Sequence, residues 1–273
     1  MPTWILWALL WALHVSPSDT AGFALFGTAG MYFPGIAALI VRYSDGDLRG
    51  TTLCRLGIRG YYCWAWFLFP LIIAATIAVD LLVGGARLDP SFQQLRSVSA
   101  NGRLSLNFLR RFAIGQLALA ILFGPLIHGL TTVGEELGWR DFLLSRFIRA
   151  GVDQWIALCA TGAIWGLWHV PLILLGLEYA AHPYFGIPMF TIYAILVGII
   201  LGWLQLASGS VWIPALAHGS INAVQRAALV FIIGYNPILS GPLGSLTGWL
   251  ILASFIARLV ITRRLPVKYS EAV

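Results

Sequence analysis

Two adjacent carboxylates end a long apolar stretch of the sequence. Glu135 and Glu136 close the run that begins near residue 112, and Arg140 stands four positions after Glu136. Residues four apart share one helix face, so Glu136 and Arg140 are expected to form a charge-assisted pair, while Glu135 turns about 100° away toward another neighbour. One carboxylate is then held as an ion, and the other, removed from water, suits the acceptance of a proton. A membrane-boundary ion pair without chemistry is the alternative for this motif taken alone.

His169 lies deep in an otherwise uncharged apolar stretch, four residues after Trp165 and two before Pro171. Proline donates no backbone hydrogen bond and disturbs the carbonyl four residues before it, so the helix is expected to open beside His169. Taken by itself, a histidine that merely links two helices is the simpler interpretation.

His218 and Asn222 are also four residues apart, which places an imidazole and an amide on one helix face, with Arg226 one turn further along. Both can donate hydrogen bonds into a cavity, and the small residues between them let a neighbouring backbone or a substrate approach. The three motifs together supply a base, a water-positioning imidazole and a pair of donors. That is the inventory for attacking an amide carbonyl and stabilising its oxyanion.

These motifs resemble the CPBP family, which comprises the CAAX proteases and bacteriocin-processing membrane proteins and is also called the abortive-infection family. Its hallmarks are EExxxR, FxxxH and HxxxN, in that order, within a bundle of eight helices. Here they read Glu135-Glu136-x-x-x-Arg140, Trp165-x-x-x-His169 and His218-x-x-x-Asn222. Trp165 stands where Phe is usual, so it keeps an aromatic wall but enlarges it, which affects substrate fit near His169 more than the chemistry.

The resemblance implies a role for each motif residue. Glu135 is expected to be the general base that activates water, and His169 to help position that water. His218 and Asn222 are expected to donate to the oxyanion. Supporting roles are implied for two further residues, Glu136 and Arg140. Family members cleave peptides near their C-termini after prenylation, or act on bacterial peptides and membrane proteins, so the expected function is that of an intramembrane endopeptidase with a peptide or membrane-protein substrate.

Three other functions stay open. The chain is alternatively a non-catalytic membrane scaffold or bacteriocin-immunity protein that retains the site, or a zinc-dependent intramembrane metalloprotease with Glu135, His169 and His218 as ligands and an open fourth position. No HExxH motif is present, and a metal-free hydrolase without cofactor is favoured. A solute transporter is disfavoured because no inverted repeat is evident.

Composition places the whole chain in a membrane. Of its 273 residues 59% are hydrophobic and 10% charged, against roughly 25% charged in an ordinary soluble domain. Lys268 is the only lysine, and the arginines behind the net charge of +6 lie near apparent membrane boundaries, which fits lipid headgroups rather than nucleic acid. The cysteines lack CxxC spacing and are expected to be buried, inert thiols: Cys54, Cys63 and Cys159.

The expected fold is an all-α, polytopic bundle of about eight transmembrane helices around an intramembrane polar cavity. It forms one domain over 1–273, with the motif core at about 112–234, and its oligomeric state is open. Segments of suitable length and hydropathy are predicted to span the bilayer at 3–15, 20–41, 62–84, 112–134, 154–177, 187–206, 212–234 and 243–262.

The loops predict the orientation of these spans. Three segments are rich in basic residues, whereas 178–186 and 235–242 carry none. With eight spans, the basic segments fall on the cytoplasmic side of what is expected to be a bacterial cytoplasmic membrane, and so do both termini. The basic segments are 42–60, 140–153 and 263–268.

The arginine-rich segment 85–111 is the exception, because it is expected to lie outside. It is predicted to form an amphipathic surface helix after Asn101–Gly102. Two further ionisable positions lie in apolar segments. His128, seven residues before Glu135, shares its helix face and is interpreted as structural, and Asp80 is a candidate partner for Arg226.

The depth of each histidine constrains how the motifs meet. At about 1.5 Å per residue, His169 lies about 22 Å into a span that begins at 154, and His218 about 9 Å into one that begins at 212. Both spans begin on the same side of the membrane. We therefore expect one long helix from about 112 to 147, which runs well past Arg140 and places Glu135 inside the membrane.

Overall fold

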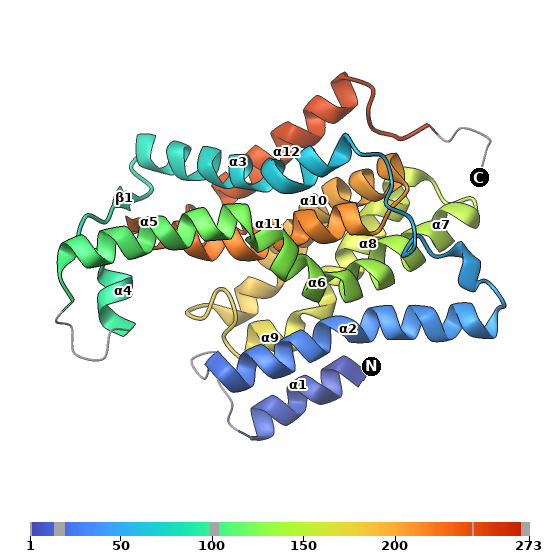
Figure 1. Cartoon of the computed structure of the whole chain (residues 1–273), viewed down its shortest axis with the longest axis horizontal. Coiled ribbons are helices and arrows are strands. Elements are labelled where there is room, and N and C mark those ends of the chain that lie inside the picture. The colour runs from blue at the N-terminus through green and yellow to red at the C-terminus, as the bar shows by residue number, and fades with distance from the viewer. Residues whose placement is uncertain (1, 14–19, 99–103, 242, 269–273) are drawn as a thin grey trace.

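Helices make up nearly all of the chain. The structure is a computed structural model that describes residues 2–13, 20–98, 104–241 and 243–268. Figure 1 shows the helices side by side along the long axis of the molecule. In chain order the elements are α1 (Pro2–Ala12), α2 (Thr20–Ser44), the 3-10 turn η1 (Leu48–Gly50), α3 (Tyr61–Leu82), β1 (Arg87–Leu88), α4 (Gln93–Val98), α5 (Leu106–Leu122), α6 (Gly124–Glu136), the π-helix η2 (Leu137–Leu144), α7 (Ser145–Arg149), α8 (Gln154–Trp168), α9 (Val170–Leu174), α10 (Pro183–Ser208), α11 (Trp212–Leu229), β2 (Ile232–Ile233) and α12 (Leu246–Ile261). The predicted all-α bundle is confirmed.

The interior of the bundle is formed around α10 and α11. Helix α11 packs against α6 and α3, α10 packs against α8, and α2 covers α6. The residues from Ile213 to Ile221 on α11 are all buried, as are those from Val197 to Gln205 on α10. Helices buried on every side are apolar all round, which is why the sequence shows apolar runs rather than amphipathic stripes here.

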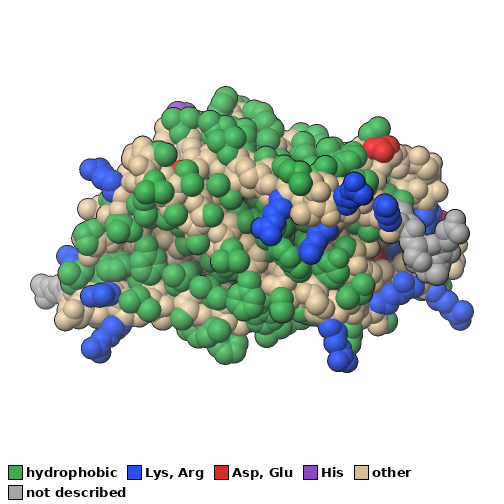
Figure 2. Space-filling view, turned by 90° about the horizontal axis from the view of Figure 1, so that it is seen from above, with side chains coloured by type: hydrophobic (Ala, Val, Ile, Leu, Met, Phe, Trp, Pro, Cys, Tyr) green, Lys and Arg blue, Asp and Glu red, His purple; other side chains and the backbone are tan. Residues whose placement is uncertain are grey.

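The outside of the bundle is apolar as well. Leu71, Leu82 and Ile261 expose 67%, 85% and 80% of their surface, and Figure 2 shows hydrophobic side chains over most of one face, with basic side chains toward its two ends and a further group to the right of centre. A soluble monomer rarely exposes so large an apolar surface. The chain is an integral membrane protein.

Among the described residues, three helices are long and apolar enough to cross a membrane, and a bent pair brings the total to four. The three are the segments Leu25–Ser44, Tyr61–Leu82 and Pro183–Ser208, and the bent pair is Leu106–Leu122 with Gly124–Arg149. The remaining predicted spans correspond to shorter helices, and the one predicted at 154–177 is divided between α8 and α9 at His169. That break confirms the expected opening of the helix beside Pro171.

The expected single helix from 112 to 147 is bent. Helices α5 and α6 meet at an angle of 56° across Phe123. Gly124 and Pro125 follow immediately, and proline fits the first turn of a new helix, where its missing N–H leaves no hydrogen bond unmade. Beyond the bend, the helical path does run past Arg140 to Arg149, through η2 and α7. This continuation carries Glu135 and Glu136 into the bundle.

The three basic segments gather at one end of the molecule, as predicted. The loop after α2 is tied to α7 by ion pairs of Asp45 with Arg146 and of Asp47 with Arg149. The C-terminal tail is tied to the start of α8, where the Val267 N–H donates to Gln154 Oε1 at 2.7 Å. Figure 1 shows α7 and the described part of the tail after α12 at this same end.

The segment 85–111 lies at the opposite end. Its first residues form an antiparallel pair, Arg87 with Ile233 and Leu88 with Ile232, and the Asp89 N–H donates to the Phe231 carbonyl at 2.9 Å. Asn101–Gly102 lie outside the described residues. The helix that follows them is α5, the first half of the bent pair, rather than a separate surface helix.

The cysteines correct one expectation. Cys54, Cys63 and Cys159 are free thiols, as expected, but each is exposed at the surface of the bundle rather than buried in it. A thiol is small and weakly polar, so for Cys63 in α3 and Cys159 in α8 a lipid-facing position satisfies the same preference as a protein core.

Candidate active site

The three motifs meet at the indole of Trp165. Its Nε1–H donates to Glu135 Oε2 at 2.6 Å, and Glu135 is only 2% exposed. The Arg140 guanidinium carbon lies 4.3 Å from the Trp165 ring centroid. The indole thus orients one carboxylate by its edge and contacts a cation by its face.

Glu136 faces different partners, as the helix geometry predicted. Its Oε1 accepts from Arg140 Nη1 at 2.9 Å and lies 2.9 Å from His218 Nδ1. Glu136 and Arg140 are fully buried. Because a carboxylate can only accept, His218 donates through Nδ1, and its Nε2 remains for other partners. Glu136 is therefore held by two donors, whereas Glu135 is held by one.

His169 ends helix α8. Its Nδ1 lies 2.9 Å from the Trp165 carbonyl oxygen, so this nitrogen carries the proton and Nε2 is left with a free lone pair. The ring packs 5.6 Å from the Trp165 ring and 4.6 Å from Phe190, measured between centroids. Because α8 ends here and α9 begins at Val170, the imidazole lies at a break in the helix, as the sequence predicted.

His218 and Asn222 come from α11. The His218 ring lies 5.2 Å from the Trp165 ring, so both imidazoles contact the same indole that binds Glu135. Asn222 lies one turn further on and is half-buried. Within the described residues its side chain makes no hydrogen bond, which leaves its amide available.

Close helix packing brings these groups together. A methyl group at Gly219 would lie 2.4 Å from the backbone nitrogen of Gly129, and one at Gly134 would lie 2.6 Å from the Tyr32 Cα. Only glycine permits such approaches. Helix α11 can therefore sit against α6, and α6 against α2, closely enough for His218 to reach Glu136.

The π-helix η2 follows the two carboxylates directly. It begins at Leu137, and Arg140 and Asp141 lie within it. Asp141 is almost fully buried and accepts hydrogen bonds from Arg42, Thr51 and Thr52. These contacts tie the loop after α2 to the segment that carries the site. Single-turn π segments occur frequently at functional sites.

The alternative of a zinc-dependent metalloprotease requires ligand side chains that are grouped around one point. Among the residues that the structure describes, no three His, Cys, Asp or Glu side chains are grouped so as to hold a metal ion. This includes the predicted set of Glu135, His169 and His218. One Glu135 oxygen is bound to the Trp165 indole.

Further ionisable groups lie beyond the motif residues. His128 on α6 is half-buried and within electrostatic range of both His218 and Arg226. Arg226 is exposed on α11 and within range of Glu178, in the loop after α9. Burial raises the pKa of Glu178, and Arg226 opposes that rise. The predicted pairing of Arg226 with Asp80 is wrong, because Asp80 Oδ2 accepts instead from the Gly241 N–H.

Sequence reasoning missed two features of the site. Trp165 was interpreted as a wall, although its N–H donates to the expected base, and the signal for this was present in the exchange of Phe for a residue with a donor. Glu178 was not singled out.

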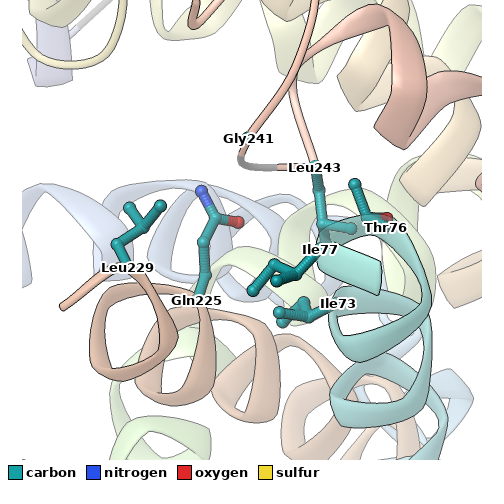
Figure 3. A pocket seen from close by; sticks show the side chains of 7 residues that line it. All are labelled: Ile73, Thr76, Ile77, Gln225, Leu229, Gly241 and Leu243. Carbon is teal, nitrogen blue, oxygen red and sulfur yellow. The ribbon is translucent and has the colours of Figure 1, made fainter. Parts of the chain in front are cut away.

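A separate hollow between α3 and α11 (Figure 3) includes none of the motif residues. It is lined by Ile73, Thr76, Ile77, Gln225, Leu229, Gly241 and Leu243.

Two comparisons show which known proteins this chain is similar to in sequence. Residues 110–224 match the family model described as type II CAAX prenyl endopeptidase Rce1-like. This matched range is termed the Rce1-like core. CAAX prenyl protease 2 from Methanococcus maripaludis is 27% identical over 233 residues, which cover 82% of this chain and 80% of that protein. The Rce1-like core contains all seven motif residues, from Glu135 to Asn222, and ends just before Arg226.

Proposed function

We propose that this protein is an intramembrane endopeptidase that hydrolyses a peptide bond near the C-terminus of membrane-associated peptides, with prenylated CAAX-type peptides as the substrate class. The Rce1-like core supports an endopeptidase, and the name of the methanococcal relative supports the substrate class. The apolar surface supports a substrate that reaches the site from the membrane.

The first chemical step uses Glu135 and His169. A water molecule bound between the Glu135 carboxylate and His169 Nε2 transfers a proton to Glu135 while its oxygen attacks the carbonyl carbon of the peptide bond. Trp165 holds the carboxylate in place through its other oxygen. The product is a tetrahedral intermediate whose former carbonyl oxygen carries the negative charge.

His218 and Asn222 stabilise that oxyanion. A doubly protonated His218 imidazole donates through Nδ1–H to Glu136 and has an Nε2–H to donate to the oxyanion. The Asn222 amide supplies the second donor. Collapse of the intermediate breaks the carbon–nitrogen bond, and the proton on Glu135 passes to the leaving amine. Arg140 donates to Glu136 and holds that carboxylate in position.

One observation carries the proposal. Glu135, His169 and His218 all contact the single indole of Trp165, through a hydrogen bond of 2.6 Å and ring distances of 5.6 and 5.2 Å. Three motifs from α6, α8 and α11 therefore converge within the bundle on one buried point.

Cleavage of a peptide library by purified protein tests the proposal. The library contains prenylated and unprenylated peptides, and each is incubated with and without a strong chelator. The expected result is cleavage near the C-terminus of prenylated peptides that is insensitive to the chelator and is lost in His169→Ala. His182→Ala, which removes an exposed histidine at the start of α10, is expected to retain activity.

The alternative functions predict different results. Loss of activity on chelation, restored by zinc, would favour the metalloprotease. A correctly folded protein that cleaves no peptide, and whose biological effect survives His169→Ala, would favour the scaffold or immunity protein.

A further inference from the structure

Arg226 is a cation without a fixed partner at the edge of the site. It is exposed in the last turn of α11 and forms no ion pair within the part of the chain that the structure describes. Arginine in an apolar helix is costly, and most charged residues inside this bundle are paired, as Arg42 and Arg140 are. An unpaired guanidinium beside a catalytic site therefore needs an explanation.

The surroundings of Arg226 place it on the route from the site to the exterior. Along one face of α11, His218 is buried, Asn222 is half-buried and Arg226 is exposed. The charges of both His218 and Arg226 act on His128 of α6. His218 and Arg226 therefore lie near the same side of α6. Exposure along this face of α11 thus increases from the proposed oxyanion donors, His218 and Asn222, to the Arg226 guanidinium.

Glu178 stands across from Arg226 on another element. Its carboxylate lies within electrostatic range of Arg226, but the two form no ion pair. Glu178 and Tyr179 both have left-handed backbone conformations, with φ of 53° and 32°. Such conformations cost free energy in residues other than glycine and concentrate at ligand-binding sites. The loop holds Glu178 near Arg226 without closing the pair, so the guanidinium keeps its donors for another anion.

The spacing along α11 matches a short C-terminal peptide. Arg226 lies about 6 Å along the helix axis from Asn222 and about 12 Å from His218. A CAAX motif has three residues after its prenylated cysteine, and three extended residues span about 10 Å. A substrate whose scissile carbonyl meets the oxyanion donors therefore extends its C-terminal carboxylate to the depth of Arg226.

We infer that Arg226 is a binding site for the free C-terminal carboxylate of the substrate. The guanidinium forms a charge-assisted pair with this carboxylate and fixes the distance between the chain end and the bond that is cut. This inference rests on the proposed function and adds to it the reason why cleavage occurs near a C-terminus. Arg226 lies outside the matched range 110–224.

The test uses two prenylated peptides that are identical except at the C-terminus, one a free acid and the other an amide. For the wild-type protein we expect KM for the acid to be about tenfold lower than for the amide, since one charge-assisted interaction is worth about a factor of ten. Arg226→Gln is expected to bind both peptides like the wild-type protein binds the amide. Arg226→Lys keeps the charge and is expected to retain most of the preference.

Arg258→Gln is the matched control, because Arg258 is also exposed in the last turn of an apolar helix, α12. It should leave the acid-to-amide ratio unchanged. Equal KM values for the two peptides in the wild-type protein, or the same ratio in Arg226→Gln as in the wild-type protein, would overturn the inference while leaving the endopeptidase in place. Cleavage of neither peptide by the wild-type protein would overturn the proposed function and this inference together.

Discussion

The Trp165 side chain shows at the scale of one residue how an exchange within a motif changes its chemistry. The indole N–H donates to Glu135, and a phenylalanine ring at this position would have no donor. Hydrogen bonds to charged groups contribute about 1.5–3 kcal/mol. If the bond holds Glu135 in its reactive orientation, its loss lowers kcat by about tenfold or more.

Trp165→Phe therefore is expected to reduce kcat for peptide cleavage by about tenfold, with little change in KM. Trp139→Phe is the matched control, because Trp139 is also buried and its Nε1 has no hydrogen-bond partner within the described residues. Steady-state kinetics of the two variants measure the difference in kcat. Equal effects of the two substitutions would show that the Trp165 N–H does not assist Glu135.

The motif residues were largely predictable because helical periodicity fixes neighbours four apart. It predicted the pair of Glu136 with Arg140 and the different direction of Glu135, and both are confirmed. It could not predict which side chain Glu135 meets, because that depends on the packing of α8 against α6. Donor contacts between helices are a tertiary property that no local pattern encodes.

At the scale of the elements, glycines decide how closely the site helices approach. Gly219→Ala is expected to push α11 away from α6, since its Cβ would lie 2.4 Å from the Gly129 nitrogen. The His218–Glu136 contact would lengthen, so we expect both a lower melting temperature and a loss of activity. Gly115→Ala is the control, because nothing lies within 4 Å of its position in α5. Equal melting temperatures and activities in the two variants would contradict the packing argument.

The contacts of Asp141 make a second prediction at this scale. Asp141→Asn removes the buried carboxylate that pairs with Arg42 at 3.3 Å and leaves Arg42 only the partly exposed Asp47 at 3.1 Å. Breaking a buried pair typically costs about 3–5 kcal/mol, and we expect a loss toward the lower end of that range because Asp47 remains. Asp45→Asn removes an exposed pair, which contributes at most about 1 kcal/mol. In thermal unfolding in detergent, we expect a clearly lower melting temperature for Asp141→Asn than for Asp45→Asn. A small effect of Asp141→Asn would mean that the loop after α2 is not anchored by this carboxylate.

Element boundaries were predicted less well than element identities. The depth argument required the helical path of Glu135 to extend past Arg140, and it does. It did not predict the bend of 56° at Phe123, although Gly124 and Pro125 are a recognisable start for a new helix. The π-helix was also unforeseen, because one inserted residue in a helix leaves no periodic signal in so short a segment.

At the scale of the whole molecule, the arrangement of loops predicts a membrane topology. The loop after α2 lies at the end that also holds α7 and the C-terminal tail, and α4 lies at the other end. A chain whose only cysteine is Cys54, and one whose only cysteine is introduced by Gln94→Cys, should react with a membrane-impermeant maleimide from opposite sides. Both positions are exposed. Labelling from the same side would contradict the proposed passage of the helices through the bilayer.

Hydropathy predicted the class of the molecule, because an apolar surface of this extent has no place in water. The prediction that the three thiols are buried was wrong. Apolar residues in a membrane protein face lipid as readily as they face the interior. The arginine-rich segment at 85–111 was placed correctly at the end opposite to the other basic segments, although its charge alone argued against that. The paired strands β1 and β2, rather than any charge pattern, hold it there.

Single-turnover cleavage of one prenylated peptide by Glu135→Gln tests the central claim most directly. The substitution keeps a group of the same size beside Trp165 but removes the base, and general-base catalysis typically contributes about 10²–10⁴-fold. We predict a rate at least about a hundredfold below that of the wild-type protein, with unchanged peptide binding. Cleavage at the wild-type rate by the folded variant would contradict the assignment of Glu135 as the residue that activates water.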